Sequence, residues 1–151
     1  MRNIKWVFAC LSIILMAASF SSAQTTDISK FDKFGDVNCE EEKARLDNFA
    51  VQLQSNPNSM GYVIVYGGSY GRRGEAQARA SRIKSYLIKS RGLGLNSVKT
   101  VDGGYMEHLT VDLRIVPRGV GAPTATPTLR PKDVRFKKGK IKRWEYGVCE
   151  P

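Results

Sequence analysis

The sequence predicts a small α/β sandwich in which a mixed sheet of three or four strands packs on two helices. Three patterns support this fold class. An apolar, β-branched run at residues 62–66 lies between glycines, which is typical of a central strand covered on both faces. Apolar residues recur at helical spacing on each side of that run. Residues 109–115 alternate apolar and polar side chains, as a strand does.

The first expected elements are a weak strand or turn within residues 31–37 and a helix that follows it. Asn38 is a residue type that caps helices. Three glutamates follow it, and negative charge is favourable at a helix N-terminus. Glu41 stands at the capping-box spacing from Asn38. The sequence Asn-Pro-Asn at 56–58 ends the helix. Its apolar stripe consists of Leu46, Phe49, Ala50 and Leu53.

After the central strand, the glycine-rich sequence GGSYGRRG leads to a second helix at about residues 75–91, with Gly92 just beyond its end. The buried stripe of this helix consists of Ala76, Ala80, Ile83 and Leu87. Residues 98–101 form the next strand, so a β-α-β unit with parallel strands is expected. In the last strand, residues 109–115, we expect one face to pack on the helices and the other to be wetter.

Residues 1–23 have the pattern of a secretory signal peptide. Arg2 and Lys5 precede an apolar run at 6–18, and small residues stand before Gln24. The alternative is a membrane anchor, but the run is shorter than the roughly 20 residues that a spanning helix needs. Cys10 lies inside the apolar run, a position that does not favour lipid attachment. We therefore expect an exported protein.

The remainder of the chain divides into one folded domain at residues 24–117, a Pro/Thr-rich linker at 118–131 and a basic C-terminal segment at 132–151. The folded domain is nearly balanced in charge, with 13 Lys and Arg against 11 Asp and Glu. From residue 118 onward there are 9 against 3, so the basic character belongs mainly to the tail. Around its KKGK turn, the C-terminal segment could form a small hairpin, which alone would be marginally stable.

Cleavage of the signal would leave two cysteines, Cys39 and Cys149. Two cysteines in an oxidising compartment favour one disulfide, which would close a loop of about 110 residues and contribute up to roughly 4–5 kcal/mol. The alternative is a pair of free thiols in a reducing compartment.

The order of short motifs over about residues 31–116 resembles the OmpA-like domain, a cell-wall-binding family. The matching residues are Phe31-Asp32, Leu46-Asp47-Asn48-Phe49-Ala50 with Leu53, Asn56-Pro57, Arg79-Ala80 with Ile83, Tyr86-Leu87, Gly92-Leu93, and Val98 to Tyr105. The resemblance implies a β-α-β-α-β-β order with a mixed sheet packed on two helices.

OmpA-like domains hold the peptide stem of peptidoglycan through a loop Asp, which receives an ammonium group, and the Arg of the RA motif, which pairs with a carboxylate. Arg79 matches that Arg. The Asp has no match, because Tyr-Gly-Gly-Ser at 66–69 stands where the family usually reads Gly-His-Thr-Asp. The shorter loop instead carries Arg72 and Arg73. These three arginines, beside a helix N-terminus, predict an anion site; the alternative is that they are solvated surface charges.

No pattern of catalytic or metal-ligating residues is visible. His108 is the single histidine and has no Cys or His partner at metal spacing, so neither a metal nor a cofactor is expected. GGSYGRRG lacks the Gly-Lys-Ser/Thr ending of a phosphate loop. We therefore expect no enzyme activity.

The sequence predicts an exported, non-catalytic cell-envelope module that contacts peptidoglycan or another anionic envelope polymer. The alternative is a structural or protein-interaction domain that keeps the fold without the ligand and contacts other envelope proteins. A third hypothesis is peripheral membrane contact through the basic tail. Nucleic acid is not expected as a partner. The protein would lie in the periplasm or cell envelope, or be secreted.

Overall fold

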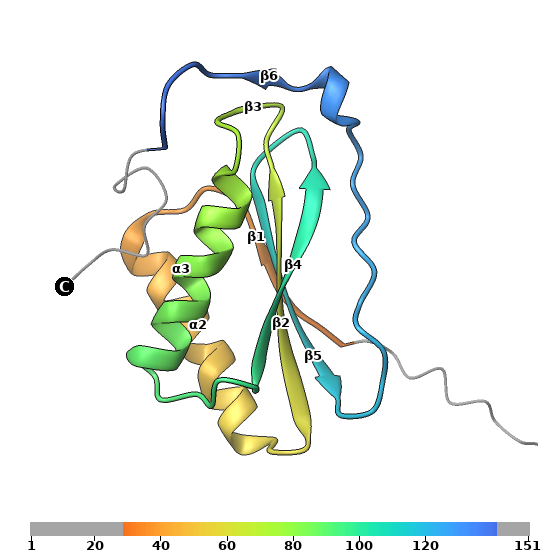
Figure 1. Ribbon diagram of the computed structural model, residues 1–151. Coiled ribbons are helices and arrows are strands. Elements are labelled where there is room, and N and C mark those ends of the chain that lie inside the picture. The colour runs from red at the N-terminus through yellow and green to blue at the C-terminus, as the bar shows by residue number, and fades with distance from the viewer. Residues whose placement is uncertain (1–28, 142–151) are drawn as a thin grey trace, which may run out of the picture.

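A four-stranded mixed sheet with two helices on one face forms the body of the protein in the computed structural model, which describes residues 29–141 (Figure 1). The elements are β1 (Ser29–Phe34), α2 (Cys39–Ser55), β2 (Ser59–Gly67), β3 (Tyr70–Gly71), α3 (Glu75–Lys89), β4 (Val98–Tyr105), β5 (Thr110–Pro117), the short 3-10 helix η2 (Pro131–Asp133) and β6 (Arg135–Phe136). The sheet order is β1-β5-β2-β4. β2 and β4 are parallel, and β5 is antiparallel to β1 and β2. The general α/β class with a mixed sheet and two helices is therefore confirmed.

Helix α2 begins where its capping residues indicate. The Asn38 side-chain oxygen accepts a hydrogen bond from the Glu41 N–H at 3.0 Å, which satisfies one of the unpaired amides of the first turn. At the other end, the Asn56 N–H donates to the Leu53 carbonyl. Asn-Pro-Asn then leads directly into β2. The cap and the stop together fix the length of the helix.

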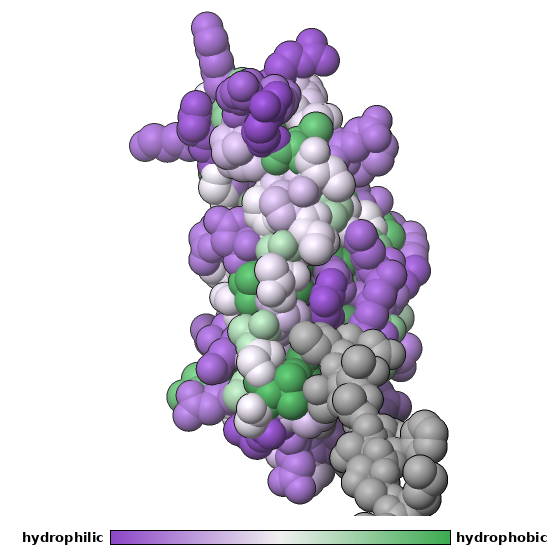
Figure 2. Space-filling model, turned by 90° about the vertical axis from the view of Figure 1, so that its right-hand side faces the viewer, coloured by the Kyte–Doolittle hydropathy of each residue, from purple (hydrophilic) through white to green (hydrophobic). Residues whose placement is uncertain are grey.

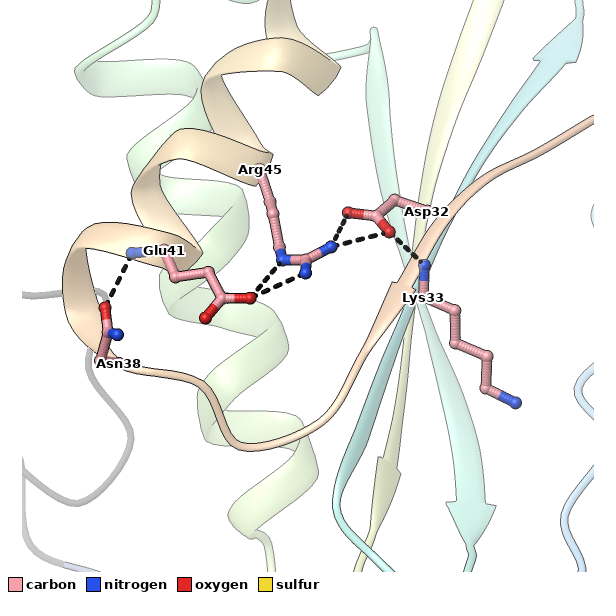
Figure 3. A network of polar contacts seen from close by, with 5 residues as sticks. All are labelled: Asp32, Lys33, Asn38, Glu41 and Arg45. Carbon is pink, nitrogen blue, oxygen red and sulfur yellow. Dashed lines mark hydrogen bonds and ion pairs between the residues drawn. The ribbon is translucent and has the colours of Figure 1, made fainter.

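Arg45 on α2 joins the helix to β1 (Figure 3). Its guanidinium donates to both oxygens of Asp32, at 2.8 and 3.0 Å, and to Glu41 at 2.7 Å. Hydrogen bonding to Asp32, and then to Glu41, raises the pKa of Arg45. The same guanidinium lies 5.3 Å from the ring centre of Phe34. These contacts hold β1 against the start of α2.

The main core lies between the helices and the sheet. Both predicted helical stripes face it, and Leu46, Phe49, Ile83 and Leu87 are all fully buried. Packing is close: a Cβ placed on Gly61 of β2 would lie 2.6 Å from the Leu53 side chain. The buried cluster comprises Phe34, Leu46, Phe49, Ala50, Leu53, Val63, Val65, Ala80, Ile83, Leu87, Leu93, Val98, Val111 and Leu113.

The opposite face of the sheet is buried over β2, as expected for a strand covered on both faces, and also at Asp112 of β5, where we expected a wetter face. Ile64 and Tyr66 are fully buried there, and Asp112 is only 3% exposed. Asp112 is stabilised by Arg114, whose guanidinium lies 2.8 Å away; this hydrogen bond is also the main cause of the raised pKa of Arg114. Residues 118–131, expected as a linker, run extended along this side of the sheet (Figure 1). The Thr126 N–H donates to the Tyr66 hydroxyl at 3.2 Å, so this covering segment is bound to the sheet.

Candidate ligand-binding surface

The glycine-rich loop after β2 and the C-terminal segment meet at one end of the molecule. β3 in the loop pairs in parallel with β6 in the tail (Figure 1). The Arg135 N–H donates to the Ser69 carbonyl and the Lys137 N–H to the Gly71 carbonyl, both at 2.9 Å. Two segments that are far apart in the sequence therefore form one surface. The second half of the expected hairpin lies outside the described residues.

This surface is strongly basic. We define the basic surface as Tyr70, Arg72, Arg73, Arg135, Lys137, Lys138 and Lys140. Segments 70–73 and 135–140 contribute six cationic side chains and no carboxylate. Figure 2 shows hydrophilic side chains gathered at the end of the molecule where β3 and β6 lie. Such a concentration of one charge attracts polyanions.

Arg72 holds the loop and the tail together. Its Nη1 donates to the Lys138 carbonyl, and its backbone N–H donates to Oε2 of Glu75 at 2.9 Å. The Glu75 carboxylate thus turns back over the loop from the first residue of α3. A Cβ on Gly71 would lie 2.3 Å from the same oxygen, so any larger residue there would displace the Glu75 carboxylate from its contact with the loop.

Arg73 is exposed and its guanidinium lies over an aromatic ring. Its guanidinium carbon is 4.1 Å from the ring centre of Phe136, which in turn meets Tyr105 edge-on at 5.8 Å. A cation–π contact of this kind holds a guanidinium without using its N–H groups. Within residues 29–141, no hydrogen bond or ion pair engages the Arg73 side chain. Its donors are therefore available to an anion.

A small cavity of about 150 Å³ lies behind the basic surface. It is lined by glycines of the loop, by the first residues of α3, by the end of β4 and by Phe136, and its charged lining residues are Arg72, Glu75 and Asp102. Asp102 accepts a hydrogen bond from the Gly104 N–H at 2.9 Å. The lining thus sets two acidic residues against one arginine, whereas the basic surface has six cations and no carboxylate, so an anionic ligand would bind on the outer surface.

Arg79 lies apart from Arg72 and Arg73, in the interior. Its side chain is 5% exposed and faces α2, where Nη2 lies 3.0 Å from Oε1 of the buried Glu42. A second ion pair joins its Nη1 to Asp36 at 3.1 Å. The structure therefore brings Arg72 and Arg73 together with the tail, and it places Arg79 in an internal ion-pair group.

Sequence reasoning did not place Tyr70, Phe136 and the tail lysines in the candidate site. The basic and apolar mixture of the tail was visible, but a two-residue strand carries no periodic signal that could reveal its pairing with the loop.

His108 is exposed in the turn between β4 and β5. In the part of the chain that the structure describes, no group of three or more His, Cys, Asp or Glu could hold a metal ion. No helix within residues 29–141 is long and apolar enough to cross a membrane.

Cys39 is disulfide-bonded, and Cys149 lies outside the described residues, so the pairing between these two stays a prediction.

The chain matches no protein-family model, no curated protein and no solved structure.

Proposed function

We propose that this protein is an exported, non-catalytic module with an OmpA-like fold, which binds an anionic polymer of the cell envelope through the basic surface. The observation that carries this proposal is the pairing of β3 with β6. This pairing adds the charges of the tail to the arginines of the loop. Peptidoglycan is one candidate polymer, because its peptide stems carry carboxylates.

The charges of the basic surface suit a polymer better than a single small anion. Arg73 and the tail lysines 137, 138 and 140 are exposed, and none of them forms an ion pair with a described residue. Each exposed contact with an anion contributes little alone and is weakened by salt. Several such contacts along one chain can add up to useful affinity. Binding should therefore fall steeply as the salt concentration rises.

Arg79 has a structural role in this proposal. Its guanidinium already donates to Glu42 and Asp36, so a ligand carboxylate would have to displace an internal partner. The proposed ligand contacts are Arg72, Arg73 and the tail cations.

The internal pairing of Arg79 also favours the second candidate function, a structural or protein-interaction domain. In that case the fold persists, but the ligand site that the OmpA-like resemblance implies has become part of the framework. The two functions differ in whether the protein binds an envelope polymer at all.

A pull-down with purified peptidoglycan sacculi, at low and at moderate salt, separates them. The test variant is the full chain with Arg73, Lys137 and Lys138 replaced by alanine. The matched control removes the same charge elsewhere, by replacing Lys84, Lys89 and Lys99. We expect the wild type and the control to bind at low salt and the test variant to lose most binding.

Equal binding by the test variant and its control would exclude the basic surface as the contact. Failure of the wild-type protein to bind sacculi, together with failure to bind soluble polyanions, would overturn the proposed function and favour the structural alternative.

A further inference from the structure

Tyr70 is the exposed aromatic side chain of the basic surface. It is 63% exposed. Among the described residues, the other large apolar side chains that are similarly exposed are aliphatic, Val51 on α2 and Leu95 before β4. Neither of these lies in the basic surface. Tyr70 therefore combines apolar area with a position among cations, as a ligand contact would require.

Tyr70 has two neighbours in the tail segment. Its backbone pairs with Arg135 in the β3–β6 ladder. The Lys137 ammonium lies over the ring, 4.6 Å from its centre, a cation–π contact that places a positive charge at the ring. With 63% of the residue exposed, much of the ring remains open to solvent. A ligand with a flat apolar face could stack there while its acidic group pairs with Lys137 or Arg135.

We propose that the anionic polymer is an acidic polysaccharide, one sugar ring of which stacks on Tyr70. This inference rests on the proposed function, because it names the class of polymer that the basic surface binds. The C–H groups on one side of a pyranose ring form a flat apolar face that fits an aromatic ring. A carboxylate or sulfate on the same sugar or on its neighbour meets the cations beside Tyr70.

Two other polyanions are distinguished by their chemistry. A polyphosphate chain has charge but no flat apolar face, so it would gain nothing from Tyr70. Single-stranded nucleic acid has bases that stack on aromatic rings. The signal-peptide pattern of residues 1–23 and the disulfide-bonded Cys39 favour an oxidising compartment outside the cytoplasm, where a polysaccharide is the expected partner.

The test uses the full mature chain with Tyr70→Ala and Tyr70→Phe, and Val51→Ala as a matched control at another exposed apolar site. Dissociation constants are measured at one fixed salt concentration for an oligogalacturonate, a linear polyphosphate and a single-stranded oligonucleotide of similar charge. Thermal melting checks that the variants remain folded, which we expect because Tyr70 is largely exposed.

We expect Tyr70→Ala to weaken oligogalacturonate binding roughly tenfold, the loss typical of one stacked ring. Tyr70→Phe and Val51→Ala should stay within about twofold of wild type, because the ring is kept or was not involved. Polyphosphate binding should be unchanged in all variants.

Unchanged oligogalacturonate binding by Tyr70→Ala, or equal losses for oligogalacturonate and polyphosphate, would overturn the stacking proposal and leave the proposed function standing. A larger loss for the oligonucleotide than for the saccharide would also overturn it, in favour of nucleic acid. Failure of the wild type to bind any of the three polyanions would overturn both proposals.

Discussion

Replacing Arg79 with alanine tests whether this residue supports the fold or contacts a ligand. Its side chain is 5% exposed, and Glu42, the partner of its Nε and Nη2, is 2% exposed. The variant would leave the Glu42 carboxylate buried without its partner. Removal of one member of a buried ion pair typically costs about 3–5 kcal/mol. The contact with Asp36 should add little, because the Asp36 side chain is 86% exposed.

The assay is urea unfolding at pH 7, followed by circular dichroism. We expect the free energy of unfolding of Arg79→Ala to fall by about 3–5 kcal/mol, and Asp36→Asn to change it by less than about 1 kcal/mol. Glu40→Gln is a matched control, because Glu40 lies in the same first turn of α2 but is exposed; it should cost at most about 0.5 kcal/mol. The double variant Arg79→Met with Glu42→Leu should lose less free energy of unfolding than the sum of the losses of the two single variants.

A free energy of unfolding for Arg79→Ala within about 1 kcal/mol of the wild-type value would refute this reasoning. That result would mean that Glu42 does not depend on Arg79. Together with lost binding to sacculi, it would return Arg79 to the ligand contacts that the OmpA-like resemblance implies.

Three further predictions concern packing, backbone conformation and pH. Leu87→Ala should lower the free energy of unfolding by about 2–5 kcal/mol in the same urea assay, since Leu87 is fully buried. A loss below about 1 kcal/mol would contradict its place in the core. Gly104→Ala should cost at least about 1–2 kcal/mol because its φ is +74°, whereas Gly121→Ala, where a Cβ meets open space, should stay within about 0.5 kcal/mol. The pKa of Asp47 lies below its ordinary value of 3.8, mainly because Arg91 donates a hydrogen bond to it. The ionised carboxylate therefore contributes fully to the free energy of unfolding above about pH 4, and this contribution is lost as the pH falls through the lowered pKa. Below about pH 4, the urea midpoint of Asp47→Asn should therefore depend less on pH than the midpoint of the wild type.

The helices could be predicted because their buried residues are periodic, and the central strand because its apolar run is unbroken. Residues 46, 49, 50 and 53 recur at helical spacing, and the structure buries all four against the sheet. The run at 62–66 has no polar residue and is buried on both faces. The covering of the second face could not be predicted in the same way. Residues 118–130 form no helix and, apart from the bridge of Leu129 to Tyr105, pair with no strand, so they carry no period that would indicate burial.

The candidate site could be predicted only in part, because its parts come from distant segments. The charges of Arg72 and Arg73 were evident, as was the basic tail. Their contact depends on β3 and β6, which are two residues each. The pairing of Arg79 with Glu42 likewise joins two helices across 37 residues of sequence. The order of residues shows where the charges lie along the chain, but the fold determines which of them form ion pairs.

The strand order also affects when during synthesis the protein can fold. β5 lies between β1 and β2, and it is the last of the four strands to be synthesised. Until it emerges, β1 has no neighbour in the sheet, and β2 and β4 form only a two-stranded unit with one helix between them. Pairings between such distant segments slow folding, because the loop must close before the contacts form. A chain that completes its sheet late remains unfolded longer, which suits a polypeptide whose first residues carry the pattern of an export signal.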